Sequence, residues 1–106
     1  MTAEQVRDLL GYKGVEAVEQ AVADRRMLAV DDNGTSLFPA FQFEENTLRF
    51  AMARILAAVP NTSAWALLQY LVAGDEGLEP RKPIDLLKGS PEDIDLVVRF
   101  AGVLEA

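Results

Sequence analysis

The stretch "EPRKPIDLLKGSPEDIDLVVRF", residues 79–100, contains three prolines, and two of them mark positions where helices are expected to begin. Pro83 suits the first turn of a short helix "PIDLLKG", because its fixed φ fits a helix and its missing N–H is not needed there. Ser90 followed by Pro91 is a helix cap and a first-turn proline for a longer helix, "PEDIDLVVRFAGVL". The stretch therefore predicts two consecutive helices that start abruptly.

Apolar residues at helical spacing predict two more helices before this stretch. The first runs from about Thr47 to Val59 and is stopped by Pro60. The second, "SAWALLQYLVAG", can be capped by Thr62 or Ser63 and is closed by Gly74. We expect these helices to bury one core, with seven inward-facing residues: Trp65, Leu68, Leu71, Leu86, Leu87, Val97 and Phe100.

The N-terminal part of the chain has the element order of a small winged helix-turn-helix unit. "MTAEQVRDLLGYKG" predicts a helix that Thr2 caps together with Gln5 and that Gly11 ends. A second helix, "VEAVEQAVADRRML", follows a short turn. Two brief strands, Leu28–Val30 and Ser36–Phe38, then flank "DDNG", which is a strong β-hairpin signal.

The segment "FPAFQFEEN" predicts an ordered connector, because flexible linkers are not rich in phenylalanine. We therefore predict a mainly α chain of two parts. Residues 1–43 form a helix-turn-helix-like unit with a β-hairpin and the connector, and residues 44–106 form a compact helical bundle. A length of 106 residues allows one modest core or two closely packed subdomains.

The composition argues against several classes of protein. Ten Lys and Arg against 17 Asp and Glu give a formal charge of −7, which disfavours nonspecific affinity for phosphate backbones. The chain has no Cys, so neither a disulfide framework nor a thiolate metal site can form. It lacks a signal pattern and any apolar run of roughly 18 residues. We expect a soluble, cytoplasmic protein that does not contact membranes.

The residues also give no pattern for catalysis. Without His or Cys, the commonest bases, nucleophiles and zinc ligands are missing. The clusters "DDNG" and "SPEDID" lack the alternating spacing and closing Glu of a calcium loop, and the glycines are isolated turn and cap residues. We expect no enzyme, no metal and no cofactor.

DNA binding is open for the N-terminal unit because its elements come in the right order. Residues 1–43 carry four basic and seven acidic side chains, a balance of about −3. Glu16, Glu19 and Gln20 occupy the second helix, where a DNA reader needs cations and base-contacting groups. We favour a structural or partner-binding derivative of this fold. The alternative is weak DNA binding, from a dimer, through three cations: Lys13, Arg25 and Arg26.

The order of motifs in the second half resembles the toxin-binding domain of Xre/MbcA/ParS-type antitoxins. In that family a Trp in one helix is followed by a Leu, a basic or small turn residue, "P-x-D-L-L" and a final helix. "LFPAFQF" is similar to a segment that precedes the domain in a subset of these proteins. The likeness covers about residues 38–106 well and the first 37 in outline. The matching residues are Trp65, Leu78, Arg81, Lys82, Pro83, Asp85, Leu86 and Leu87.

This resemblance implies a bacterial antitoxin of a type II toxin–antitoxin pair. The usual partners of the family are RES-domain toxins, which consume or transfer parts of NAD. The chain would cover the toxin's NAD pocket with its C-terminal segment and do no chemistry itself, and a homodimer is left open. Its N-terminal unit is shorter and more acidic than the DNA-binding domain of many members, which puts transcriptional autoregulation in doubt.

Two groups of residues are the expected toxin contacts. Arg81 and Lys82 project from a turn that Pro83 stiffens, and rigidity lowers the ordering cost of using them in an interface. From the residues alone, a solvated turn without a partner explains either side chain equally well. Asp85, in the first turn of the following helix, is expected to cap its backbone donors.

The second group is the apolar stripe Phe100, Val103 and Leu104. It lies where chains usually fray into polar residues, which favours a covering partner. From the residues alone, these side chains could equally complete the chain's own core. Two other functions stay open, a small helix-turn-helix transcription regulator and a non-catalytic adaptor.

Overall fold

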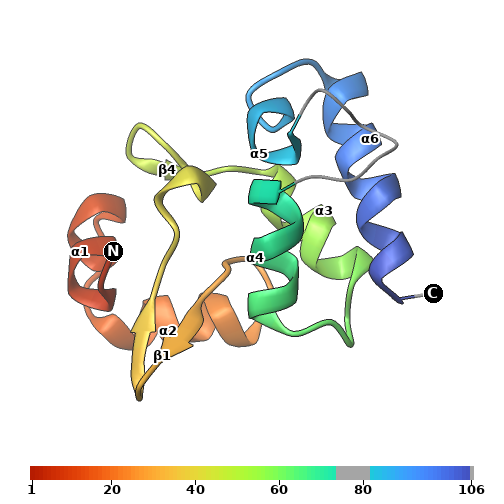
Figure 1. The fold of residues 1–106 in the computed structure, drawn as a ribbon. Coiled ribbons are helices and arrows are strands. Elements are labelled where there is room, and N and C mark those ends of the chain that lie inside the picture. The colour runs from red at the N-terminus through yellow and green to blue at the C-terminus, as the bar shows by residue number, and fades with distance from the viewer. Residues whose placement is uncertain (74–81, 106) are drawn as a thin grey trace. The chain divides into compact units, whose positions relative to one another are not determined.

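The computed structural model describes residues 1–73 and 82–105, and its helices and short strands confirm the expected mainly α fold with a small hairpin (Figure 1). Contacts divide the chain into two units, Met1–Leu56 and Ala57–Ala106. The elements in chain order are α1 (Ala3–Leu10), α2 (Val15–Ala23), β1 (Val30–Asp32), β2 (Thr35–Leu37), η1 (Ala40–Gln42), β3 (Phe43–Glu44), β4 (Thr47–Leu48), α3 (Ala51–Ala58), α4 (Ala64–Ala73), α5 (Pro83–Leu86), α6 (Pro91–Ala101) and η3 (Gly102–Glu105), where η denotes a 3₁₀ helix.

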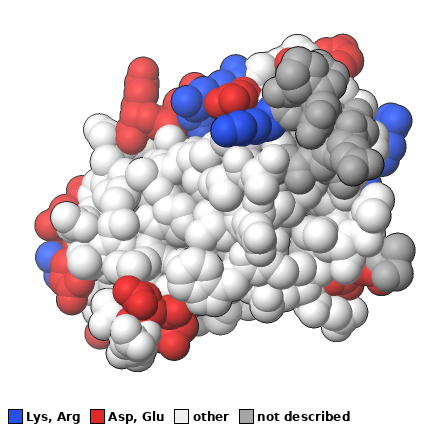
Figure 2. All heavy atoms as spheres, in the orientation of Figure 1, with Lys and Arg blue, Asp and Glu red and all other residues white. Residues whose placement is uncertain are grey.

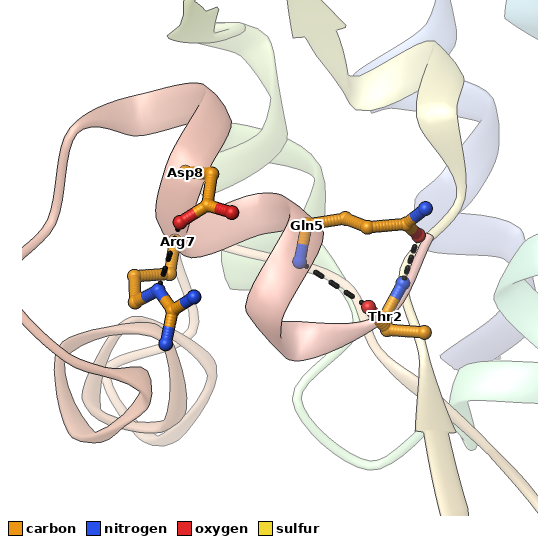
Figure 3. Close-up of polar contacts among 4 residues, drawn as sticks. All are labelled: Thr2, Gln5, Arg7 and Asp8. Atoms are coloured by element: carbon orange, nitrogen blue, oxygen red, sulfur yellow. Dashed lines mark hydrogen bonds and ion pairs between the residues drawn. The ribbon is translucent and has the colours of Figure 1, made fainter.

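Helix α1 forms as its sequence predicts (Figure 3). The Thr2 hydroxyl accepts a hydrogen bond from the Gln5 N–H at 3.2 Å, and the Thr2 N–H donates to the Gln5 side chain at 2.8 Å. Gly11 ends the helix with φ of 74°, a left-handed conformation that glycine adopts without a steric penalty. On the surface of the helix, a hydrogen bond to Asp8 at 2.9 Å raises the pKa of Arg7.

The first hairpin, β1–β2, is antiparallel and turns at Asn33 and Gly34, whose φ angles are 54° and 87°. Two successive positive φ angles are those of a type I′ turn, the turn whose twist matches a hairpin. With Asn33 and Gly34 at the centre, Asp32 pairs with Thr35, so both aspartates of "DDNG" belong to the strand. The first strand is therefore shifted toward the turn from the predicted Leu28–Val30.

A second hairpin, β3–β4, was not predicted from the sequence. Phe43 pairs with Leu48, and Phe43 is buried in the N-terminal core. The Arg49 side chain donates from Nε to the Phe41 carbonyl at 2.8 Å. These contacts keep residues 43–49 with the N-terminal unit, whereas the sequence analysis placed the division after residue 43. They also explain why α3 begins at Ala51 and not near residue 47.

The core of the N-terminal unit is formed by side chains from both helices and from the segments around the hairpins. Its one buried polar side chain in the described residues is Gln42, which lies in η1. The order of two helices and a hairpin fits the helix-turn-helix-like prediction. The buried apolar cluster consists of Val6, Val18, Ala21, Met27, Phe38 and Phe43.

In the C-terminal unit, α5 packs against both α4 and α6. The Tyr70 hydroxyl of α4 donates to the Val97 carbonyl of α6 at 3.0 Å in the buried interior. Four of the seven predicted core residues are buried: Leu71, Leu86, Leu87 and Val97. Leu68 and Phe100 are only partly buried. The prediction for Trp65 is wrong, because 54% of this residue is exposed.

The predicted starts of three helices in this unit are confirmed. The Ser63 hydroxyl accepts from the Ala66 N–H at 3.1 Å and so caps α4. Pro83 occupies the first turn of α5. Ser90 and Asp93 form a reciprocal capping box at the start of α6. The last helix is shorter than predicted, because the backbone tightens from α into 3₁₀ geometry after Ala101.

Candidate functional site

The segment that follows α6 presents apolar side chains on the surface. The 3₁₀ helix η3 leaves Val103 58% exposed and Leu104 39% exposed. Phe100 is partly buried and the neighbouring Ala101 is fully buried. The predicted apolar stripe therefore divides: Phe100 contributes in part to the interior, whereas Val103 and Leu104 face outward.

Glu105 ties this segment to the loop between α3 and α4. Its carboxylate accepts hydrogen bonds from the Asn61 backbone N–H at 3.2 Å and from the Asn61 side-chain amide at 3.2 Å. It also accepts from the Thr62 hydroxyl. Sequence reasoning missed this residue, because its partners lie 43 and 44 positions away and nothing in the local pattern marks the pairing. We call this group, formed by Asn61, Thr62 and Glu105, the Glu105 clamp.

Helix α5 presents Lys82 at its start. Lys82 has extended backbone angles at the N-cap position and an exposed side chain, and Pro83 is buried next to it. Leu86 and Leu87 are 6% and 3% exposed and anchor the short helix in the core. Asp85 lies in the first turn as expected, but it is exposed, and within the described residues no side chain caps α5. The capping role predicted for Asp85 is therefore wrong.

Two residues of the motif, Leu78 and Arg81, lie outside the described residues. Lys82 precedes α5, and Val103 and Leu104 follow α6 in η3 (Figure 1). The two expected groups of contact residues therefore lie on different elements of the C-terminal unit.

A further apolar surface runs along α4. Trp65 and Val72, seven residues apart and therefore on one face of the helix, are 54% and 43% exposed. The helix "AWALLQYLVA" has no charged side chain, and Figure 2 shows uncharged surface over it. Leu67, Tyr70 and Leu71 cover the opposite, buried face. An amphipathic surface helix normally has a polar outer face, so α4 is unusual in being apolar on both sides.

The three cations considered for DNA binding differ in whether they already have a partner within the chain. Lys13 is exposed. The Arg25 guanidinium donates from Nε and Nη2 to the Leu56 carbonyl, at 3.3 and 2.8 Å, and so satisfies a carbonyl in the last turn of α3. Arg26 lies 3.5 Å from the Asp24 carboxylate. Two of the three therefore already have partners within the N-terminal unit.

Among the helices of residues 1–73 and 82–105, none combines the length and apolar character needed to cross a membrane. Comparison of the chain with protein-family models, curated proteins and solved structures gives no match.

Proposed function

We propose that this chain is the antitoxin of a type II toxin–antitoxin pair and that it neutralises a cytoplasmic RES-domain toxin by covering the toxin's active site. It acts through binding and performs no chemistry. The observation that carries the proposal is the exposure of Val103 and Leu104 on an ordered 3₁₀ helix that the Glu105 clamp holds in place. Exposed apolar side chains that are held in an ordered segment are the features of a protein-binding surface.

The charge of the C-terminal unit supports a basic partner. Residues 57–106 carry eight acidic and four basic side chains, a balance of −4. A pocket that binds the phosphates of NAD needs cations, and an acidic surface complements such a pocket. Complementary charges of this kind speed association and select the partner, while the apolar contacts of η3 supply most of the affinity.

The N-terminal unit supports a protein partner more than DNA. The Arg25 guanidinium is occupied by the Leu56 carbonyl, and Arg26 is paired with Asp24. Glu16, Glu19 and Gln20 are exposed on α2, where a DNA-reading helix would present cations.

The first test is whether a RES-domain protein is encoded beside the gene for this chain. Expression of that protein alone should arrest growth, and co-expression of the chain should restore it. The double variant Val103→Asp, Leu104→Asp should keep its helical circular dichroism spectrum and lose protection, because both side chains are exposed in the free chain and buried by the partner. Point changes are preferable to truncation after Arg99, which would also remove the buried Ala101 and the Glu105 carboxylate.

The control is Phe50→Asp, which places one carboxylate at an apolar residue that is 86% exposed in the other unit. This variant should protect as well as the unchanged chain. Full protection by the double variant would remove η3 from the interface. A growth arrest that the unchanged chain fails to relieve would refute the antitoxin function.

A further inference from the structure

The loop that hydrogen-bonds to Glu105, between α3 and α4, is fixed by its own contacts. The Thr62 N–H donates to the Val59 carbonyl at 3.2 Å, and Val59 is fully buried. The next residue, Ser63, caps α4. The Asn61 and Thr62 donors are therefore fixed to the core of the C-terminal unit on one side and to the start of α4 on the other.

The 3₁₀ helix η3, in contrast, has little stability of its own. It spans four residues, Gly102–Glu105, and 3₁₀ hydrogen bonds have poorer geometry than those of an α-helix. Val103 is 58% exposed and Leu104 39% exposed, so neither side chain anchors the segment fully in the core. Within residues 82–105 and the described part of α4 and its preceding loop, the Glu105 carboxylate connects η3 to Asn61 and Thr62.

We propose that Glu105 is a positioning residue of the docking surface: its bonds to Asn61 and Thr62 hold η3 in the arrangement that presents Val103 and Leu104 to the partner. This inference rests on the proposed function. Glu105 acts through the two apolar side chains, because its own carboxylate is engaged within the chain. A segment ordered before binding loses less conformational entropy when the partner arrives, and the clamp thereby strengthens binding.

The arrangement also couples the Asn61–Thr62 loop to the partner. Binding free energies are reciprocal: if the clamp strengthens partner binding, partner binding strengthens the clamp by the same factor. The Asn61 backbone N–H donates into the clamp, so its hydrogen exchange reports the clamp directly. It should exchange faster in Glu105→Ala than in the unchanged chain, and more slowly in the complex than in the free chain.

The deciding experiment is a calorimetric titration of the purified RES-domain toxin with four chains: the unchanged chain, Glu105→Ala, Val103→Ser, and the chain that carries both Glu105→Ala and Val103→Ser. Glu105→Ala should bind about tenfold more weakly, which corresponds to about 1.4 kcal/mol. In the Val103→Ser background, Glu105→Ala should reduce the affinity by a clearly smaller factor. The apolar side chain that Glu105 positions is then already absent, so removing Glu105 has less effect on binding. Glu105→Gln retains an acceptor oxygen for the Asn61 N–H and should be intermediate.

The control is Glu92→Ala, which removes an exposed carboxylate of the same unit at the start of α6. It should change neither the affinity nor the exchange of Asn61. Unchanged affinity in Glu105→Ala would overturn the positioning role, and so would an equal loss in the Val103→Ser background. If the unchanged chain does not bind the toxin, the proposed function fails and the positioning role falls with it, whereas faster Asn61 exchange in Glu105→Ala would still establish the clamp itself.

Discussion

Gln42 and Leu28 exchange two hydrogen bonds in the core of the N-terminal unit. The Leu28 N–H donates to the Gln42 Oε1 at 2.8 Å, and the Gln42 Nε2 donates to the Leu28 carbonyl at 2.8 Å. Gln42 is fully buried. A buried amide is costly unless it is paired, and here one side chain satisfies both backbone groups of a residue that lies outside any strand. The pairing joins the segment before β1 to η1, within "LFPAFQF".

Replacing Gln42 with Met should destabilise the N-terminal unit strongly. The side chains are similar in length, so the change removes the two hydrogen bonds without leaving a large cavity. Two buried backbone groups would be left unpaired, at about 1–3 kcal/mol each. The expected loss is about 2–5 kcal/mol in the free energy of unfolding, measured by urea denaturation. Gln20→Met, on the exposed face of α2, should change it by less than about 0.5 kcal/mol.

Leu87→Asp should prevent the C-terminal unit from folding. Leu87 is 3% exposed, and the substitution would bury a carboxylate without a partner. Lys88→Asp places the same carboxylate at the next, exposed residue and should leave the thermal transition nearly unchanged. Circular dichroism melting of both variants tests the pair. A normal melting curve for Leu87→Asp would contradict the placement of this residue in the core.

The half-exposed Trp65 gives a sharp test of which face of α4 is buried. Trp65→Ala should lower the free energy of unfolding by less than Leu71→Ala, although it removes far more atoms. Leu71 is fully buried, and a Leu→Ala change in a core costs about 2–5 kcal/mol. Denaturation of both variants shows which substitution lowers the free energy of unfolding more. A larger loss for Trp65→Ala would place the indole in the core, as its sequence pattern had predicted.

Features that depend on neighbours in the sequence were predictable. Both capping boxes, the first-turn prolines and the Asn33–Gly34 turn arise from residues at most three positions apart, and their chemistry can be read from the sequence. The spacing of apolar residues also located the helices, although α3 begins only after the β3–β4 hairpin and the last helix changes to 3₁₀ geometry after Ala101.

Features that depend on distant partners were not predictable. Gln42 looks like an ordinary polar residue until its pairing with Leu28, 14 positions away, is seen. The role of Glu105 was equally hidden in the sequence, because its partners Asn61 and Thr62 lie in the loop between α3 and α4. The predicted burial of Trp65 was wrong for a different reason. Helix α4 has apolar residues on both faces, so the spacing of apolar residues cannot tell which face is buried. The predicted site thus retained Lys82, Val103 and Leu104 as exposed residues but lacked the group that holds η3.

Two glycines with open space around them should respond oppositely to alanine. A Cβ at Gly34 or at Gly102 would meet no atom within 4 Å, so only the backbone conformation differs. Gly34 has φ of 87°, where alanine costs about 1–2 kcal/mol. Gly102 has φ of −58°, where alanine should raise the free energy of unfolding by about 0.4–1 kcal/mol. If Gly34→Ala and Gly102→Ala changed the thermal stability equally, the positive φ of Gly34 in a type I′ turn would be contradicted.

The N-terminal unit should bind duplex DNA only in the nonspecific range, with Kd of roughly 10⁻⁴–10⁻⁶ M at physiological salt. Its α2 helix exposes Glu16 and Glu19, and Arg25 and Arg26 are engaged within the unit. The measurement is a gel-shift titration with the duplex upstream of the chain's own gene and with an unrelated duplex of equal length. Equal weak shifts are expected, because a surface without base-reading groups cannot distinguish the two sequences. A sequence-specific shift at nanomolar protein would favour a transcription regulator instead.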